Sequence, residues 1–480
     1  MPASHPKLGA TDAVIQLSGS LLAQRMLRGV NRYGQWITDM SRRGKLVREG
    51  RPVATRAGAC AVALGLALAG CTGSAAPQHV PAPGGVTAAS GLPGGGLSPA
   101  QVWAAYDLEP LLREGIDGKG QTIVVVEPFG SPTIRHDLAV FDQRLGLQAP
   151  PALRVIQPAG AVPRYRPTET RTSAAGETTL DVEWAHAMAP GANILLVETP
   201  TAENEGRSGF PQIARAEEYV IKHHLGGVIS QSFGATESTF RSRAALMQLR
   251  AAYRLAARPG YRVTVIAATG DSGAAGLTNS TRSFFKTPQV SWPASDPLVT
   301  AVGGTQLSLA RSGIRRAPAV AWPGSGGGRS AVFPRPAYQD NVANVTGQAR
   351  GIPDISMDAS CTSSVEVYGN DGSYPANPPG WSTGCGTSLA APMFAGIVAL
   401  ADQEARHTLG AINPALYKMA ASHDPGIVDI LRGDNSFRFP SNGKSYVVQG
   451  FHARPGYDLI SGVGTIDAAR FVPELAKAAG

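Results

Sequence analysis

The chain has 480 residues, and 43% of them are hydrophobic, which is enough to bury a large core. The formal net charge is +8, but residues 1–71 hold ten Lys and Arg against three Asp and Glu, a net of +7, which leaves +1 for residues 72–480. Because the basic character belongs to the first 71 residues, the charge implies no nucleic-acid partner.

The first 71 residues have the features of an export signal. Arg48, Arg51 and Arg56 precede an apolar stretch, residues 57–70, that is too short to span a bilayer. The Leu-Ala-Gly-Cys sequence that ends at Cys71 resembles the lipobox of bacterial lipoproteins, in which the cysteine is lipidated. We therefore expect a leader over residues 1–71 and an exported protein, anchored by lipid at the outer face of the bacterial cytoplasmic membrane or secreted. A plain signal peptide with a chance cysteine is the alternative.

Residues 72–97 are rich in Pro, Gly, Ala and Ser and have no apolar periodicity, which predicts a flexible tether. From residue 98 onward, short β-branched runs alternate with helical stretches, as in a doubly wound α/β domain. The runs are continuously apolar, which indicates strands buried on both faces of a parallel sheet. The expected strands are Thr122–Val126, Asn193–Val197, Gly227–Ser230, Val263–Ala267 and Val299–Val302. The expected helices are Ser98–Tyr106, Thr178–Met188, Ile213–His224, Thr239–Ala257 and the apolar run Leu389–Ala401.

Two carboxyl groups belong to the second of these helical stretches. Glu177 and Asp181 are four residues apart, so on a helix they lie about 40° apart on one face, whereas Glu183 and His186 fall away from it. Two carboxyls this close cannot both ionise easily, so one keeps a proton and the pair can act as general base and then general acid. An ordinary solvated acidic pair is the alternative.

Two further residues carry candidate chemistry. Asp271 follows an expected strand, at the carboxyl end of the sheet, where open α/β folds bind ligands. Ser388 follows a Gly-Thr turn and directly precedes an apolar helix, where free backbone N–H groups and the helix dipole favour the negative charge of an acyl-transfer intermediate. Taken alone, Asp271 could be a turn cap and Ser388 a turn or N-cap residue.

Beyond the leader the chain has two cysteines, Cys361 and Cys385. In an exported protein two cysteines can pair, and a disulfide here would stiffen the loop beside Ser388. Cys385 as a nucleophile is the alternative, which the lack of a histidine nearby in the sequence disfavours.

Together, Glu177, Asp181, Asp271 and Ser388, with their flanking motifs, resemble the sedolisin family, the serine-carboxyl peptidases. The other matching segments are residues 97–101, 118–122, 189–192, 228–234 and 353–356. The resemblance implies a subtilisin-like α/β fold over residues 98–480, with a mostly parallel central sheet flanked by helices. It also implies a serine-type peptidase that acts in acid on peptide or protein substrates, which the leader marks for export.

The resemblance gives each of the four residues a role. Ser388 is expected to be the nucleophile that forms an acyl-enzyme, with Glu177 as its base in place of a histidine. Asp181 is expected to orient and polarise Glu177. Asp271, kept protonated, is expected to donate a hydrogen bond to the oxyanion.

By the same resemblance, Ser232 and Gly234 lie on the strand that pairs with an extended peptide substrate. Glu127, at the end of the first expected strand, departs from the aspartate that the family normally has there, and we interpret it as a structural acid beside the site. Subtilisins proper need a histidine base, typically in a His-Gly-x-His segment, and none of the nine histidines lies in such a segment.

The resemblance also implies one structural Ca²⁺ site near the C-terminus. Its expected ligands are the side chains of Asp429 and Asp458 and the main-chain oxygens of Ile430, Arg454 and Gly456. Oxygen-only ligation on loops suits Ca²⁺, and a carbonyl ligand tolerates Arg454 where the family usually has glycine.

A second functional class is a lipid-anchored, non-catalytic peptide-binding protein on a peptidase scaffold. Family members are generally made with a large prosegment, whereas here only the tether separates Cys71 from the expected catalytic domain. The complete set of four residues favours catalysis, because a decayed site is expected to lose at least one of them.

Overall fold

The computed structural model describes residues 92–203, 208–279, 283–310, 312–370 and 380–480. The expected leader, with Cys71, and most of the expected tether lie outside these residues. Within the described ranges no helix combines the length and apolar character that crossing a bilayer requires.

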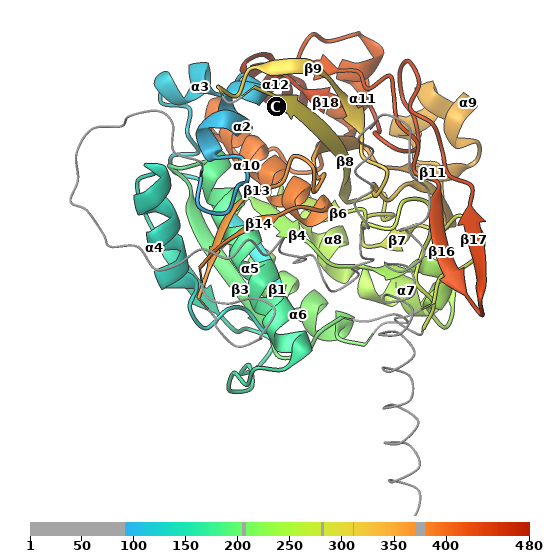
Figure 1. Cartoon of the computed structure of the whole chain (residues 1–480), viewed down its shortest axis with the longest axis horizontal. Coiled ribbons are helices and arrows are strands. Elements are labelled where there is room, and N and C mark those ends of the chain that lie inside the picture. The colour runs from blue at the N-terminus through green and yellow to red at the C-terminus, as the bar shows by residue number, and fades with distance from the viewer. Residues whose placement is uncertain (1–91, 204–207, 280–282, 311, 371–379) are drawn as a thin grey trace, which may run out of the picture. The chain divides into compact units, whose positions relative to one another are not determined.

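An eight-stranded sheet forms the centre of the described part of the chain (Figure 1). Its order is β12-β8-β6-β4-β1-β3-β2 with all neighbours parallel, and β9 pairs antiparallel with β8. These strands are β1 Thr122–Pro128, β2 Leu153–Ile156, β3 Asn193–Thr199, β4 Val228–Gln231, β6 Thr264–Ala268, β8 Thr300–Leu309, β9 Arg315–Ala321 and β12 Ile355–Asp358. Because β1 pairs with both β3 and β4, the strand order reverses beside β1, which is where such sheets place their sites.

Shorter strands form antiparallel pairs around this sheet. They are β5 Ala235–Thr236 with β7 Ser291–Trp292, β10 Gly328–Pro334 with β11 Ala349–Ile352, β13 Val365–Gly369 with β14 Gly380–Gly384, β15 Ile427–Val428 with β18 Thr465–Ile466, and β16 Phe437–Ser441 with β17 Lys444–Val448. The helices are α2 Pro99–Tyr106, α3 Glu109–Arg113, α4 Ile134–Leu145, α5 Glu169–Met188, α6 Phe210–Lys222, α7 Arg243–Leu249, α8 Ala251–Ala256, α9 Ala343–Thr346, α10 Thr387–Ala405, α11 Asn413–Ala421 and α12 Ala468–Ala479, with 3₁₀ turns η1 Glu237–Thr239 and η2 Ala337–Val342.

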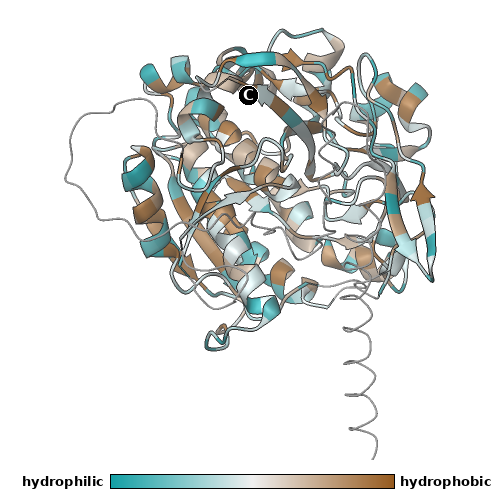
Figure 2. Ribbon diagram, viewed as in Figure 1, coloured by the Kyte–Doolittle hydropathy of each residue, from teal (hydrophilic) through white to brown (hydrophobic). Residues whose placement is uncertain are grey.

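Both faces of the sheet are covered by helices, as the continuous apolar runs predict. Side chains of β1 alternate between two cores: Ile123 and Val125 join one, and Val124 and Val126 join the other. The first core includes α2, α4, α5, α10, α11 and α12, and the second includes α6, α7 and α8. In Figure 2 hydrophobic residues gather on the central strands and the helices beside them, whereas α4 alternates between hydrophobic and hydrophilic bands. The mostly parallel α/β architecture is confirmed.

The helix that carries the paired carboxyls is longer than the sequence pattern predicts. It begins at Glu169 rather than Thr178, after Thr168 accepts a hydrogen bond from the Arg171 amide as N-cap. Its first half is polar and contains Gly176, so it lacks the apolar periodicity that would reveal it. Glu177 therefore lies in the helix interior.

The helical stretch expected over residues 239–257 is instead broken into η1, α7 and α8. The break between α7 and α8 falls at Arg250, whose backbone has φ −79° and ψ 7°. The Arg250 guanidinium donates to the Asp296 carboxylate at 2.7 Å, an interaction between distant segments that helical periodicity cannot reveal.

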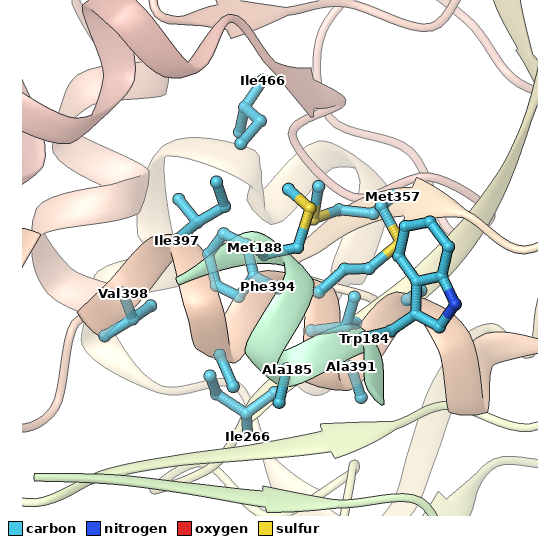
Figure 3. Close-up of a cluster of buried hydrophobic side chains, with 14 of the residues drawn as sticks. Trp184, Ala185, Met188, Ile266, Met357, Ala391, Phe394, Ile397, Val398 and Ile466 are labelled. Atoms are coloured by element: carbon cyan, nitrogen blue, oxygen red, sulfur yellow. The ribbon is translucent and has the colours of Figure 1, made fainter. Parts of the chain in front are cut away.

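Helix α5 packs directly on α10, the helix that begins beside Ser388 (Figure 3). Trp184 and Met188 of α5 lie among Phe394 and its neighbours on α10 in a core from which water is excluded. A Cβ at Gly396 would lie 2.5 Å from the Met188 Cβ, so only glycine permits this approach. The packing fixes the two helices that carry three of the four candidate catalytic residues.

Residues 94–97, which the composition assigns to the tether, lie against β13. The Glu366 carboxylate accepts hydrogen bonds from the amides of Gly94 (2.8 Å) and Gly96 (2.6 Å). Leu97 forms a parallel bridge with Val365. Residues 94–97, just before the expected helix at Ser98, are therefore part of the packed domain.

Some carboxyl groups are buried in the interior of the protein, and burial raises their pKa because it disfavours the charged form. The pKa is raised to about 7 for Asp358, at the end of β12, and to about 8 for Asp402, in α10. A hydrogen bond from the Leu409 amide to Asp402, at 2.8 Å, opposes the second shift only in part. Both groups are thus protonated in the folded protein in acid.

We therefore expect the folded state to be most stable in acid. In the unfolded chain these carboxyls titrate near pH 4, so the free energy of unfolding falls as the pH rises from about 4 through about 8. The melting temperature of the Ser388→Ala variant, measured by calorimetry, should fall by about 5 °C or more between pH 4 and pH 8. Asp402→Asn, whose amide does not titrate, should flatten this fall. A melting temperature that rises toward pH 8 would contradict the assignment.

Candidate active site

The candidate catalytic residues meet at the carboxyl edge of the central sheet. Glu127 lies at the end of β1, Ser232 follows β4 and Asp271 follows β6. These strands are parallel neighbours, so their carboxyl ends share one edge. Helices α5 and α10 bring Glu177, Asp181 and Ser388 to the same place.

Ser388 lies in the first turn of α10 and is 7% exposed. The turn begins at Gly386, whose φ of 106° lies in a region that glycine adopts without strain. The Ser388 hydroxyl lies close enough to the Glu177 carboxyl to lower the pKa of that carboxyl. A hydroxyl at a helix N-terminus beside a buried carboxyl is the arrangement of a nucleophile and its base.

Asp181 is fully buried one helical turn beyond Glu177. The Ser232 hydroxyl lies 2.6 Å from its Oδ2, to which it donates, and 3.2 Å from the main-chain oxygen of Ser388. Burial raises the pKa of Asp181 to about 7, while hydrogen bonds from Ser232 and Glu127 lower it. Ser232 thus ties the carboxyl-bearing helix to the start of α10.

Glu127 is 1% exposed and lies beside the carboxyls of Glu177 and Asp181. From the sequence it was interpreted only as a structural acid beside the site, so this contact was not predicted. Burial first, and then the charges of Asp181 and Glu177, hold its pKa well above the ordinary value. A protonated Glu127 donates its hydrogen bond to Asp181. Its place at the carboxyl end of a strand beside the switch in strand order is the signal that could have indicated it.

The same environment raises the pKa of Glu177. Burial is the largest cause, the charge of Asp181 follows, and the hydrogen bond from Ser388 lowers it; Asp271 and Glu203 add smaller repulsions. A carboxylate with a raised pKa is a stronger base than an ordinary glutamate, which is what proton transfer from an alcohol requires.

Asp271 is held by the residue before Ser388. Its Oδ1 accepts hydrogen bonds from the Thr387 amide (2.7 Å) and the Thr387 hydroxyl (2.9 Å). Its Oδ2 lies against Gly386, where an added Cβ would be 2.7 Å away. Burial raises the pKa of Asp271, which favours a protonated carboxyl in acid. Thr387, expected only as part of a turn, thus holds the Asp271 carboxyl.

Ser232 and Gly234, expected on a substrate-pairing strand, lie between β4, which ends at Gln231, and β5. A Cβ at Gly234 would be 3.1 Å from the main-chain oxygen of Trp292, so this segment runs close to β7. The Ser232 side chain is directed to Asp181 rather than to an open edge.

Cys361 and Cys385 form a disulfide with a Cα–Cα distance of 5.0 Å. The bond joins the segment after β12 to the residue just before Gly386, and it encloses the β13–β14 pair. Because Cys385 is in the disulfide, the alternative of a Cys385 nucleophile is wrong.

The side chains of two expected calcium ligands, Asp429 and Asp458, lie against one turn. The Gly456 amide donates to Asp429 at 2.8 Å, and the Arg454 amide donates to Asp458 at 3.0 Å, so the two carboxylates flank residues 454–456. Ile430 is buried beside Asp429. No cluster of three or more His, Cys, Asp or Glu side chains suited to a metal occurs among the described residues. Two carboxylates with main-chain oxygens nevertheless fit a hard cation such as Ca²⁺.

Comparison with known proteins identifies the family and the fold. Residues 170–425 match the subtilase family. The chain is 31% identical to kumamolisin from Bacillus sp. (strain MN-32) over 396 residues, which are 80% of this chain and 64% of that protein. It is 32% identical to tripeptidyl-peptidase 1 of Homo sapiens over 320 residues, 64% of this chain and 52% of that protein. The chain thus spans about half to two thirds of the length of the curated relatives it matches.

Among solved structures, a Pseudomonas sedolisin, described as a serine-carboxyl proteinase, superposes with a TM-score of 0.67 at 25% identity. The match covers 80% of this chain and 99% of that one. The fold is therefore subtilisin-like, as expected. The chain belongs to the subtilase family and, by its relatives, to the sedolisins, the serine-carboxyl peptidases.

Proposed function

We propose that the protein is a serine-carboxyl peptidase that hydrolyses peptide bonds in acid through an acyl-enzyme on Ser388. The observation that carries the proposal is the position of Ser388 at the start of α10 beside the buried Glu177–Asp181 pair, with Ser232 bonded both to Asp181 and to the Ser388 main chain. Kumamolisin, the tripeptidyl-peptidases and sedolisin as relatives support the same chemistry, with peptides or proteins as substrates.

In the proposed first step, the Ser388 oxygen attacks the peptide carbonyl carbon while its proton moves to Glu177. The tetrahedral intermediate then breaks its C–N bond, and the amine leaves with the proton from Glu177. The acyl group remains on Ser388 as an ester. Water attacks this ester with Glu177 again taking the proton, and the acid product leaves as Ser388 regains its hydrogen.

Asp181 assists Glu177 both before and after Glu177 takes the proton of Ser388. It accepts hydrogen bonds from Ser232 and Glu127, which favour negative charge on Asp181. The ionised fraction of Asp181, a minority at pH 4 because burial raises its pKa to about 7, stabilises Glu177 when Glu177 has taken the proton of Ser388. Glu177 and Asp181 thus share a single negative charge. Because Glu127 is protonated, it adds no second negative charge beside them.

Asp271 supplies the proposed hydrogen bond to the oxyanion. Its Oδ1 is taken by Thr387, which leaves Oδ2 as the atom that can carry the proton. The donor exists only while Asp271 is protonated, below its raised pKa. The N-terminus of α10 adds the positive end of its dipole to the same place.

The test is hydrolysis of a denatured protein at about pH 4 and at pH 8. Because the oxyanion donor is lost as the pH rises, peptides should be released at pH 4 and much less at pH 8. Equal release at both values contradicts the carboxyl assignments. No release at either value favours the non-catalytic binding protein.

We further propose that the 454–456 turn binds Ca²⁺ through the side chains of Asp429 and Asp458 and the main-chain oxygens of Ile430, Arg454 and Gly456. A bound cation would neutralise the two carboxylates and cross-link the loops that carry them. Saturating Ca²⁺ should then raise the melting temperature of the inactive Ser388→Ala variant by several degrees relative to excess chelator. Asp429→Asn should remove most of this difference. An identical melt with and without chelator counts against the site.

We also propose export with a lipid anchor at Cys71, or release of a secreted form. The leader pattern supports this, and the Cys361–Cys385 disulfide suits an oxidising compartment outside the cytoplasm. Labelling of cells with a radioactive fatty acid should mark the protein and spare a Cys71→Ser variant. Equal labelling of both excludes this anchor.

A further inference from the structure

Three residues after Asp271 the chain meets a distant loop. The Ala274 amide donates to the main-chain oxygen of Asn435 at 2.9 Å. Gly273 lies so close that an added Cβ would be 2.3 Å from the same oxygen, and its φ of +54° lies in the left-handed region. Asn435 is fully buried. The turn that follows Asp271 therefore packs against the main-chain oxygen of Asn435.

The side chain of Asn435 connects two other segments. Its Nδ2 donates to the main-chain oxygen of Ser325 at 3.0 Å, and its Oδ1 accepts from the Phe451 amide at 2.7 Å. The loop that contains Ser325 also holds the Asp271 turn. Gly273 donates to the Gly324 oxygen at 2.9 Å, and the Gly326 amide donates to the Gly270 oxygen at 2.8 Å. The Asn435 side chain thus connects Phe451 to the loop at residues 324–326, and that loop is itself hydrogen-bonded to the Asp271 turn.

The contact continues into the loop that carries the expected cation ligands. Residues 433–435 pair with residues 451–453: the Asn435 amide donates to the Phe451 oxygen at 3.2 Å, and the Ala453 amide donates to the Gly433 oxygen at 3.0 Å. Arg454 follows directly. One short ladder therefore runs from the turn at residues 454–456 to the turn that bears Asp271.

We propose that Asn435 is a positioning residue that fixes the turn at residues 270–274 and, through it, the Asp271 carboxyl. The proposal rests on the proposed function, in which Asp271 donates to the oxyanion. That hydrogen bond forms fully only in the transition state, so a displaced carboxyl lowers kcat while KM changes little. Asn435 itself acts only through the turn.

The test compares Asn435→Ala with Ser436→Ala. Ser436 accepts a hydrogen bond from the Gly450 amide at 2.9 Å in the same ladder, so its replacement removes a neighbouring bond of the same kind without breaking the link to Ser325. Asn435→Ala should lower kcat about 10- to 100-fold, with KM within about twofold of wild type. Hydrogen exchange in a peptide covering residues 269–276 should become faster. Ser436→Ala should change neither kcat nor the rate of hydrogen exchange in this peptide.

Should Asn435→Ala fail to fold, Asn435→Leu serves instead, because leucine has nearly the shape of asparagine and lacks both the donor to Ser325 and the acceptor for Phe451. Wild-type kcat with a lowered melting temperature would reduce Asn435 to an ordinary structural residue. If wild-type enzyme releases no peptide, the proposed function fails on its own. The rate of hydrogen exchange at residues 269–276 still tests the role of Asn435. Equal rates in Asn435→Ala and Ser436→Ala would overturn the inference.

Discussion

Replacing Ser388 with alanine should lower kcat on a peptide substrate at pH 4 by at least about 10⁴-fold, because the acyl-enzyme can no longer form. Only one hydroxyl is removed, and that hydroxyl lies beside the Glu177 carboxyl. The α10 helix should remain intact, since alanine favours helix and Thr387 still binds Asp271. The measurement is the initial rate of peptide release by the purified variant.

A matched serine outside the site controls for nonspecific effects. Ser422, at the end of α11, bonds only to the Met419 oxygen of its own helix among its described side-chain contacts, so Ser422→Ala should keep wild-type turnover. Equal peptide release by Ser388→Ala and wild type would rule out Ser388 as the nucleophile. A loss of activity that accompanies a collapsed melting transition would point instead to misfolding.

The local parts of the site could be predicted from the sequence. Glu177 and Asp181 share a helical face because their spacing is four residues, and this depends on no other segment. Likewise, each continuous apolar run became a strand of the central sheet, since a strand buried on both faces needs no polar alternation. The Gly-Thr-Ser turn before an apolar run placed Ser388 at a helix start.

The nonlocal parts could not be predicted in the same way. Glu127 reaches Asp181 only because β1 pairs with β4 and lies under α5, and the order of strands is not written in any single segment. Ser232 was expected only on a strand that pairs with substrate, and the hydrogen bond from its hydroxyl to Asp181 was not predicted. The direction of a side chain just beyond a strand depends on the helix packed above it, and periodicity carries no information about that contact.

Replacing Asp271 with asparagine should keep the fold and lower kcat about 10²-fold, near the usual cost of weakening an oxyanion donor. The amide oxygen of asparagine can still accept both hydrogen bonds from Thr387, so the turn keeps its shape. What changes is the group at the Oδ2 position, where an N–H replaces the more acidic O–H of a protonated carboxyl. KM should change little, because this hydrogen bond strengthens only as charge develops on the oxyanion.

The pH profile separates this role from a structural one. In wild type, kcat should fall toward neutral pH as Asp271 loses the proton that its raised pKa retains in acid. The amide of Asp271→Asn does not titrate, so the residual activity should fall less steeply over the same range. Asp340→Asn, an exposed change beside Arg335, should leave both the rate and the profile unchanged. Near-wild-type turnover with an unaltered profile would mean that the oxyanion donor lies elsewhere, since a carboxyl that acts there cannot lose its acid proton without consequence.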